Sequence, residues 1–141
     1  MQSNSPICVD ASWIMRLIET PPQQGAWTLW KRWRSEGRRI VAPALLLYEI
    51  TNAFHQYVRH GLLSSSELDS ILTDINELNI LLVEDIDLHR KAAELAREFE
   101  LKATYDAHYL ALAQRMDAEF WTYDKRLVRV VGKTFPWVKL A

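Results

Sequence analysis

Residues 103–127 read ATYDAHYLALAQRMDAEFWTYDKRL, and they join a very apolar helical pattern to a short apolar run. The positions after Asp106 follow helical spacing, and EFWTY is typical of a short buried strand. Asp106 falls in the first turn of this helix, and Asp124 directly follows the strand. The stretch therefore predicts a helix and a core strand with an acid at the outer end of each.

The same alternation of strands and helices continues along the whole chain. Short apolar runs predict further strands at residues 7–9, 39–41 and 79–85. Helical periodicity predicts helices that begin near residues 12, 25, 43, 64 and 87, and a last helix over residues 124–131. Such alternation builds βαβ units with helices on both faces of the sheet. We expect one α/β domain, residues 1–141, folded as a three-layer α/β/α sandwich around a mostly parallel sheet.

Individual residues mark where the helices begin and end. Pro43 is expected in the first turn of a helix, where its missing N–H costs nothing. Gly61 is expected just beyond the end of that helix. Ser64 stands three residues before Glu67, which is the spacing of a capping box.

Composition and charge limit the kinds of protein that this chain can be. It has 141 residues, 49% of them hydrophobic, and a formal net charge of −1. A globular domain is expected, and no overall basic field draws it to nucleic acid. Its single cysteine, Cys8, cannot form an internal disulfide, which suits a reducing cytosol. No signal peptide and no apolar run of about 18 residues is present, so we expect a soluble cytoplasmic protein without membrane contact.

Four carboxylates are predicted to gather at one edge of the sheet. Open parallel sheets bind ligands at the carboxyl ends of their strands, and Asp10 and Asp124 follow strands there. Glu49 and Asp106 lie on helical stripes that lean toward the interior. Carboxylates crowded together repel one another unless a cation lies among them. Oxygen ligands without His or Cys suit Mg²⁺ or Mn²⁺ rather than zinc.

Each acid also has a simpler structural interpretation. Asp10 and Asp124 can cap the helices that follow them. Asp106 can interact with a helix dipole, and Glu49 can pair with a nearby Arg or Lys. One metal site explains all four positions together, whereas the simpler interpretations need a separate reason for each.

Basic and aromatic residues offer two possible uses. A stretch of α-helical character holds five cations within nine residues, interleaved with tryptophans: Lys31, Arg32, Arg34, Arg38 and Arg39, with Trp27, Trp30 and Trp33. They could contact RNA, or the cations could form a solvated helix face whose tryptophans pack inward or at an interface. A second group could hold a substrate phosphate or form an outer helix face: Lys125, Arg126 and Arg129. His108 points away from Asp106, so no catalytic histidine is expected.

Four segments, ICVDAS, LLLYEITNAF, TYDAHYLALA and EFWTYDKRL, resemble in order and spacing the four acidic motifs of PIN-domain ribonucleases. The likeness extends from Pro6 to about Leu140 and is greatest to the VapC-type toxins of type II toxin–antitoxin pairs. YDAHYLALA followed by AEFWTYDKRL is the specific part of the signal. Asp117 departs from the pattern, because glycine is expected in that turn. Asp tolerates a left-handed backbone, so Asp117 is interpreted as a turn residue.

The resemblance implies an endoribonuclease that uses Mg²⁺ or Mn²⁺ and leaves a 5′-phosphate and a 3′-hydroxyl. It implies RNA as substrate, a cognate antitoxin as partner, and a homodimer. The implied catalytic and metal-binding residues are Asp10, Glu49, Asp106 and Asp124, and the implied supporting polar residues are Ser12, Asn52 and Thr122.

Two other classes of function compete with the nuclease. A phosphatase with an aspartyl nucleophile after the first strand would carry a second acid two residues after Asp10, where Ser12 stands. A catalytically silent binding module would have lost at least one of the four acids, and all four are present. The nuclease is therefore the preferred hypothesis.

Overall fold

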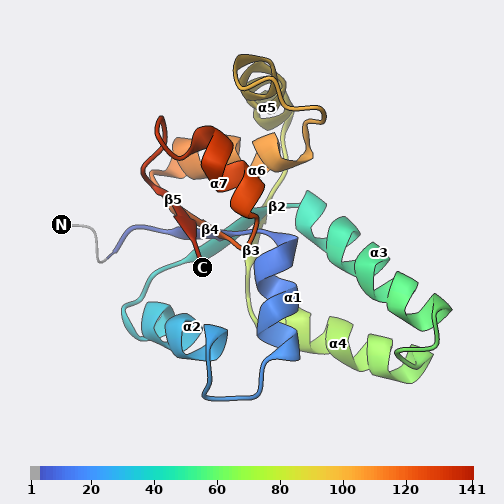
Figure 1. Ribbon diagram of the computed structural model, residues 1–141. Coiled ribbons are helices and arrows are strands. Elements are labelled where there is room, and N and C mark those ends of the chain that lie inside the picture. Colours follow the sequence, from blue (N-terminus) through green and yellow to red (C-terminus); the bar gives the residue numbers. More distant parts are fainter. Residues whose placement is uncertain (1–3) are drawn as a thin grey trace.

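The computed structural model describes residues 4–141, and within them the chain forms one five-stranded parallel sheet in the order β3-β2-β1-β4-β5 (Figure 1). The strands are β1 (Ile7–Val9), β2 (Ile40–Pro43), β3 (Leu81–Val83), β4 (Glu119–Thr122) and β5 (Val138–Leu140). Cys8 pairs with Val41 on one side and with Phe120 on the other. Because neighbours cover both of its edges, β1 is the centre of the sheet.

Helices cover both faces of this sheet. They are α1 (Ala11–Glu19), α2 (Ala26–Ser35), α3 (Leu45–Arg59), α4 (Ser65–Glu77), α5 (Ile86–Glu98), α6 (Tyr105–Met116) and α7 (Lys125–Val131). Helices α1 to α4 connect β1 to β2 and β3, whereas α5 to α7 connect β3 to β4 and β5. Because the two series of strands extend in opposite directions from β1, right-handed connections place these helices on opposite faces. Figure 1 shows α1, α2 and α4 across the sheet from α5, α6 and α7, which confirms the predicted three-layer sandwich.

The structure differs from the sequence analysis in three places. Pro43 ends β2 instead of opening α3, because Ala44 N–H still donates to the Val83 carbonyl (3.0 Å). Strand β3 is not buried: it is the sheet edge, where Leu81 and Leu82 are 44% and 36% exposed. The C-terminal apolar segment, for which no strand was predicted, forms β5 beside β4. Apolar runs of three or four residues do not reveal which strand lies at an edge.

The predicted helix-end signals are present. Ser64 Oγ accepts a hydrogen bond from Glu67 N–H while the Glu67 carboxylate accepts one from Ser64 N–H, which completes the capping box. Gly61 follows α3 with a φ of 73°, and Asp117 ends α6 in the left-handed region with a φ of 50°. Among residues 4–141, no helix is both long and apolar enough to cross a bilayer.

Tryptophans pack beneath the sheet instead of facing solvent. Trp13 is fully buried, and its ring centroid lies 5.0 Å from that of Trp33 and 6.1 Å from that of Trp30. Trp33 also contacts Trp121 of β4, with ring centroids 5.5 Å apart. The interpretation that these tryptophans pack inward is confirmed for Trp30 and Trp33, so neither ring is available to stack on a base.

One member of the basic stretch is structural. Arg38 is only 8% exposed, and its guanidinium donates to the Ser5 carbonyl and hydroxyl oxygens. It also forms ion pairs with Glu36 and Glu119. The predicted patch of five cations therefore loses this member to the fold, whereas Lys31, Arg32 and Arg34 are exposed along α2.

Replacing Trp33 by alanine tests the tryptophan cluster. We expect Trp33→Ala to lower the free energy of unfolding by about 3–5 kcal/mol, because it removes a buried aromatic ring from between two others. Arg34→Ala changes an exposed neighbour on the same helix, so it should cost less than about 0.5 kcal/mol. Urea denaturation of both variants provides the measurement. Equal losses would show that the cluster does not support the fold.

Candidate active site

The four predicted acids lie near the carboxyl edge of the central strands. Asp10 follows β1, and Asp124 follows β4, its neighbour in the sheet. The connections from these two strands run to opposite faces, so the acids stand at a topological switch point, where open α/β sheets bind ligands. Glu49 extends from α3 and Asp106 from the first turn of α6, which adds one acid from each helical layer.

Asp10 is the most constrained of these acids. Its side chain is 7% exposed and accepts three hydrogen bonds. Oδ1 accepts from the Ser12 hydroxyl (2.6 Å) and from Trp13 N–H (3.0 Å). Oδ2 accepts from the Thr122 hydroxyl (2.5 Å). One residue thus caps α1 and joins β1 to the end of β4.

The two hydroxyls also fix the turn that carries Asp124. Ser12 Oγ accepts from Tyr123 N–H (3.2 Å), and Thr122 Oγ1 accepts from Asp124 N–H (3.0 Å). Each hydroxyl therefore accepts from the turn and donates to Asp10. This pair of bridges sets the position of Asp124 relative to Asp10.

Asp124 caps α7, as its simpler interpretation predicts. Its Oδ1 accepts from Arg126 N–H (3.0 Å) and Leu127 N–H (3.1 Å). Capping engages one oxygen, and a carboxylate oxygen has more than one lone pair. The capping of α1 by Asp10 and of α7 by Asp124 is therefore compatible with further ligands on both acids.

Glu49 has a partner that sequence reasoning missed. Tyr109 of α6 donates its hydroxyl hydrogen to Glu49 Oε1 at 2.6 Å, across 60 residues of sequence. The Tyr109 ring is 1% exposed and stacks on Phe120 of β4 with ring centroids 5.8 Å apart. A buried tyrosine usually needs a hydrogen-bond acceptor for its hydroxyl. The apolar run AHYLALA predicts that Tyr109 is buried, so the sequence could have indicated that a polar partner such as Glu49 lies nearby.

The acids influence one another electrostatically. Burial is the main cause that raises the pKa of Asp10, Glu49 and Asp106 above their usual values. The charge of Asp124 further raises the pKa of Asp10 and Asp106, and the charges of Asp106 and Asp10 raise that of Glu49. The four side chains are therefore close enough for the charge of one to affect the protonation of another.

The chemistry of this donor set fits a hard divalent cation. Carboxylate oxygens are the ligands that Mg²⁺ and Mn²⁺ prefer, and a cation would relieve the repulsion among them. Within residues 4–141, no three His, Cys, Asp or Glu side chains are close enough to form a complete coordination group. The donors therefore suit the ion in kind, and binding would require some of these side chains to approach one another.

Asn52 and His108 have other partners. The Asn52 side chain is exposed, its Oδ1 accepts from Gln56 (3.4 Å), and within residues 4–141 it makes no hydrogen bond to Glu49. The ring of His108 contacts the Thr104 carbonyl oxygen (2.7 Å) and the ring of His89 (2.8 Å). His108 thus points away from the acids, as predicted.

A cavity of about 490 Å³ opens beside Glu49, Asp106 and Asp124. Its volume falls in the ~300–1,000 Å³ range of ligand sites. Lys102, from the loop before α6, and Arg126 of α7 also line it. Arg126 was predicted to be a phosphate contact, whereas Lys102 was not singled out because it stands outside every motif. The cavity therefore combines carboxylates that suit a metal ion with basic side chains that suit a phosphate.

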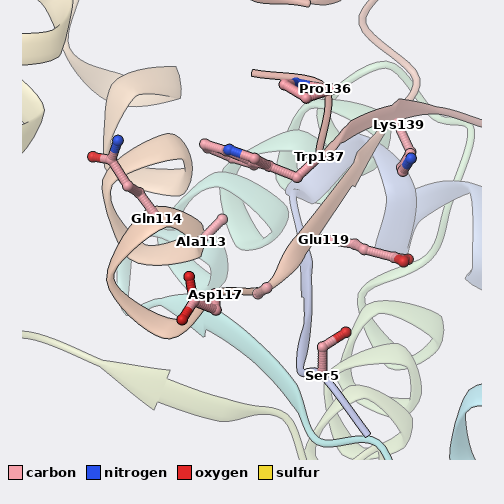
Figure 2. A pocket seen from close by; sticks show the side chains of 9 residues that line it. Ser5, Ala113, Gln114, Asp117, Glu119, Pro136, Trp137 and Lys139 are labelled. Carbon is pink, nitrogen blue, oxygen red and sulfur yellow. The ribbon is translucent and has the colours of Figure 1, made fainter. Parts of the chain in front are cut away.

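A second cavity, of about 560 Å³, lies near the start of β4 (Figure 2). Figure 2 shows Asp117, Glu119, Trp137 and Lys139 around it. Glu119 is already bonded to Trp121 Nε1 and paired with Arg38. None of the predicted site residues lines this cavity, so it is separate from the acidic site.

Comparisons with known proteins agree with this fold. The model of the PIN domain family matches residues 7–133. Ribonuclease VapC3 of Pyrobaculum aerophilum is 28% identical over 98 residues, which cover 66% of this chain and 72% of the relative. The crystal structure of PAE2754 from the same organism superposes with a TM-score of 0.60 at 21% identity, covering 92% of this chain and 86% of the other. A toxin–antitoxin complex from Klebsiella pneumoniae superposes with a TM-score of 0.56 at 17% identity, covering 94% of this chain and 95% of the other.

Removing the Tyr109 hydroxyl tests the hydrogen bond to Glu49. That bond lowers the pKa of Glu49 against the effect of burial, so Tyr109→Phe should raise the pKa further. Stability should fall by about 1–3 kcal/mol, the usual loss for a hydrogen bond to a charged group. Carbon-13 NMR titration of the Glu49 carboxyl is the measurement, with Tyr57→Phe as a tyrosine control outside the site. An unchanged Glu49 titration would show that the hydroxyl does not hold this carboxylate.

Proposed function

This chain belongs to the PIN domain family, and from that membership we propose that it is a metal-dependent endoribonuclease that hydrolyses phosphodiester bonds in RNA. The observation that carries the proposal is the group of acids near the carboxyl edge of β1 and β4, where burial and neighbouring carboxylates raise the pKa of Asp10, Glu49 and Asp106. The similarity to a protein named as a ribonuclease supports it.

The proposed cofactor is Mg²⁺ or Mn²⁺, held by Asp10, Glu49, Asp106 and Asp124. When bound, such a cation helps water to lose a proton and offsets the negative charge that develops on the phosphoryl oxygens. Asp10 or Asp124 can accept the proton of the attacking water, since both are carboxylates at the same strand edge.

The remaining residues of the site have positioning and binding roles. Ser12 and Thr122 hold both oxygens of Asp10, and Tyr109 holds Oε1 of Glu49. These bonds fix Asp10 and Glu49 before substrate arrives, which reduces the reorganisation that the reaction requires. Arg126 and Lys102 line the same cavity, and in this proposal they contact phosphates of the RNA. Asn52 faces solvent, so a supporting role for it would have to be a direct contact with substrate.

We further propose that the protein is the toxin of a toxin–antitoxin pair and acts in the cytoplasm on RNA. The similarity to a protein named Ribonuclease VapC3 and the shared fold with a chain of a toxin–antitoxin complex support this proposal. The partner would be the cognate antitoxin, a protein that covers the toxin until it is released.

A homodimer is also proposed, and an exposed apolar surface supports it. Leu47 and Tyr48 of α3 are 39% and 76% exposed, and they line one hollow with Leu82 of β3. Leu81 is exposed on the same edge strand, whose outer backbone groups pair with no further strand among residues 4–141. Apolar patches and unpaired edges mark interfaces in soluble proteins, and a second copy of this chain would cover both.

Asp106→Asn tests the nuclease. Cleavage of total cellular RNA in Mg²⁺ or Mn²⁺, measured by mapping new 5′-phosphate ends, should fall at least about 100-fold, since even outer partners of metal ligands contribute ~10–100-fold. EDTA should abolish the same ends in wild type. If the variant and the chelated sample still produce them, the acids are not the site of cleavage.

The stability of the same variant separates loss of the site from loss of the fold. Without metal, the raised pKa values of the acids mean that the protein loses stability as pH rises through them. Asp106→Asn removes one of these charges, so it should stabilise the metal-free protein at pH 7 by about 0.5–2 kcal/mol. Added Mg²⁺ should then raise the Tm of wild type more than that of the variant.

Tyr48→Glu tests the dimer. Placing a charge in the centre of the apolar surface should weaken self-association at least about 30-fold, the effect of losing ~2 kcal/mol at a principal contact. Leu62→Glu changes a side chain that is 74% exposed but does not line the hollow, so it should leave association unchanged. Analytical ultracentrifugation compares the three proteins. A monomeric wild type, or equal association of all three, would contradict this interface.

A further inference from the structure

Tyr105 is an exposed aromatic residue at the acidic cavity. It is the first residue of α6, directly before Asp106, and its side chain is 59% exposed. It lines the cavity together with Glu49, Asp124 and Arg126. A single exposed aromatic ring is common on protein surfaces, so its exposure alone implies nothing. Its place within reach of the proposed cleavage site is what requires an explanation.

Two cations line the same cavity as this ring. Lys102 precedes α6 and Arg126 belongs to α7, and both are exposed. Other basic residues form ion pairs, for example Arg115 with Asp85, but neither Lys102 nor Arg126 forms one within residues 4–141. Unpaired cations beside several carboxylates suit a ligand that carries negative charge at intervals, such as a nucleic acid backbone.

An aromatic face and two cations together match a nucleotide whose base is unstacked. Single-stranded RNA is recognised by stacking bases on aromatic side chains while cations hold the phosphates. In a duplex each base face is already covered by its neighbours, and the ring of Tyr105 would find none open. The second cavity lacks this combination, since Lys139 is the one basic side chain among its lining residues.

We propose that Tyr105 is a stacking platform for one unpaired base next to the scissile phosphate, with Lys102 and Arg126 holding the flanking phosphates. This inference rests on the proposed nuclease function, because it assigns a base-binding residue to the same site. It makes Tyr105 a residue that determines specificity, whereas the four acids determine chemistry.

The test measures RNA binding in EDTA, so that it does not depend on cleavage. The probe is a short single-stranded RNA containing 2-aminopurine, whose fluorescence is quenched when the base stacks. Wild type and Tyr105→Phe should bind and quench. Tyr105→Leu, an apolar side chain without an aromatic face, should bind about 10-fold more weakly, within the range for loss of one base stack, and should not quench. Leu62→Ala is the control for truncating an exposed side chain elsewhere.

Variants of the two basic residues and competition by a double-stranded RNA provide further measurements. Lys102→Ala and Arg126→Ala should each lower the slope of log affinity against log salt by about 0.7, the value for one phosphate contact to a single strand. A fully paired RNA of the same sequence should compete at least about 10-fold less well. The proposal is overturned if Tyr105→Leu quenches like wild type, if the duplex competes equally, or if wild type does not bind the probe.

Cleavage assays in Mg²⁺ or Mn²⁺ then distinguish this inference from the proposed function. Stacking that is equally strong in the ground and transition states affects KM, so Tyr105→Leu should raise KM about 10-fold with a smaller change in kcat. Normal KM in that variant, with active wild type, refutes the platform and leaves the nuclease standing. Stacking in EDTA without any metal-dependent cleavage refutes the nuclease instead.

Discussion

Asp10 carries a nearly buried carboxylate, and the geometry of the site depends on how that charge is held. Its oxygens accept hydrogen bonds from Ser12, Trp13 and Thr122, which belong to α1 and to the end of β4. The same hydroxyls accept from the backbone of the turn that carries Asp124. An unsatisfied buried charge costs several kcal/mol, so these bonds stabilise the fold while they fix the distance between two acids.

Helix α6 connects the chemistry to the core. It carries Asp106 at its solvent end, and one turn later Tyr109 reaches Glu49 on the opposite layer. Nearly every side chain between Ala107 and Ala113 is buried, and the helix packs against β1, β2 and β4. A helix held on so many sides cannot shift easily. Its two polar groups are therefore placed by packing, and the cost of crowding carboxylates is met by the surrounding apolar contacts.

The competing functions fit this arrangement less well. A phosphatase with an aspartyl nucleophile at Asp10 would carry a second acid two residues later. That residue is Ser12, whose hydroxyl donates to Asp10 and accepts from Tyr123 N–H. A silent binding module would have no need to hold repelling carboxylates near one another. The structure keeps them near one edge of the sheet, where burial raises the pKa of Asp10 and Asp106, and this crowding is a liability unless a cation or a reaction makes use of it.

The sequence by itself determined the order of the helices and of the first four strands, the capping box at Ser64 and the candidate acids, because periodicity and capping act over a few residues. Tertiary structure alone decided that Tyr109 holds Glu49, that Arg38 serves the fold, and that β3 is an exposed edge. It also gave Asn52 a partner other than Glu49. These outcomes depend on contacts between segments tens of residues apart, and such contacts are set by how whole layers pack, which no local pattern records.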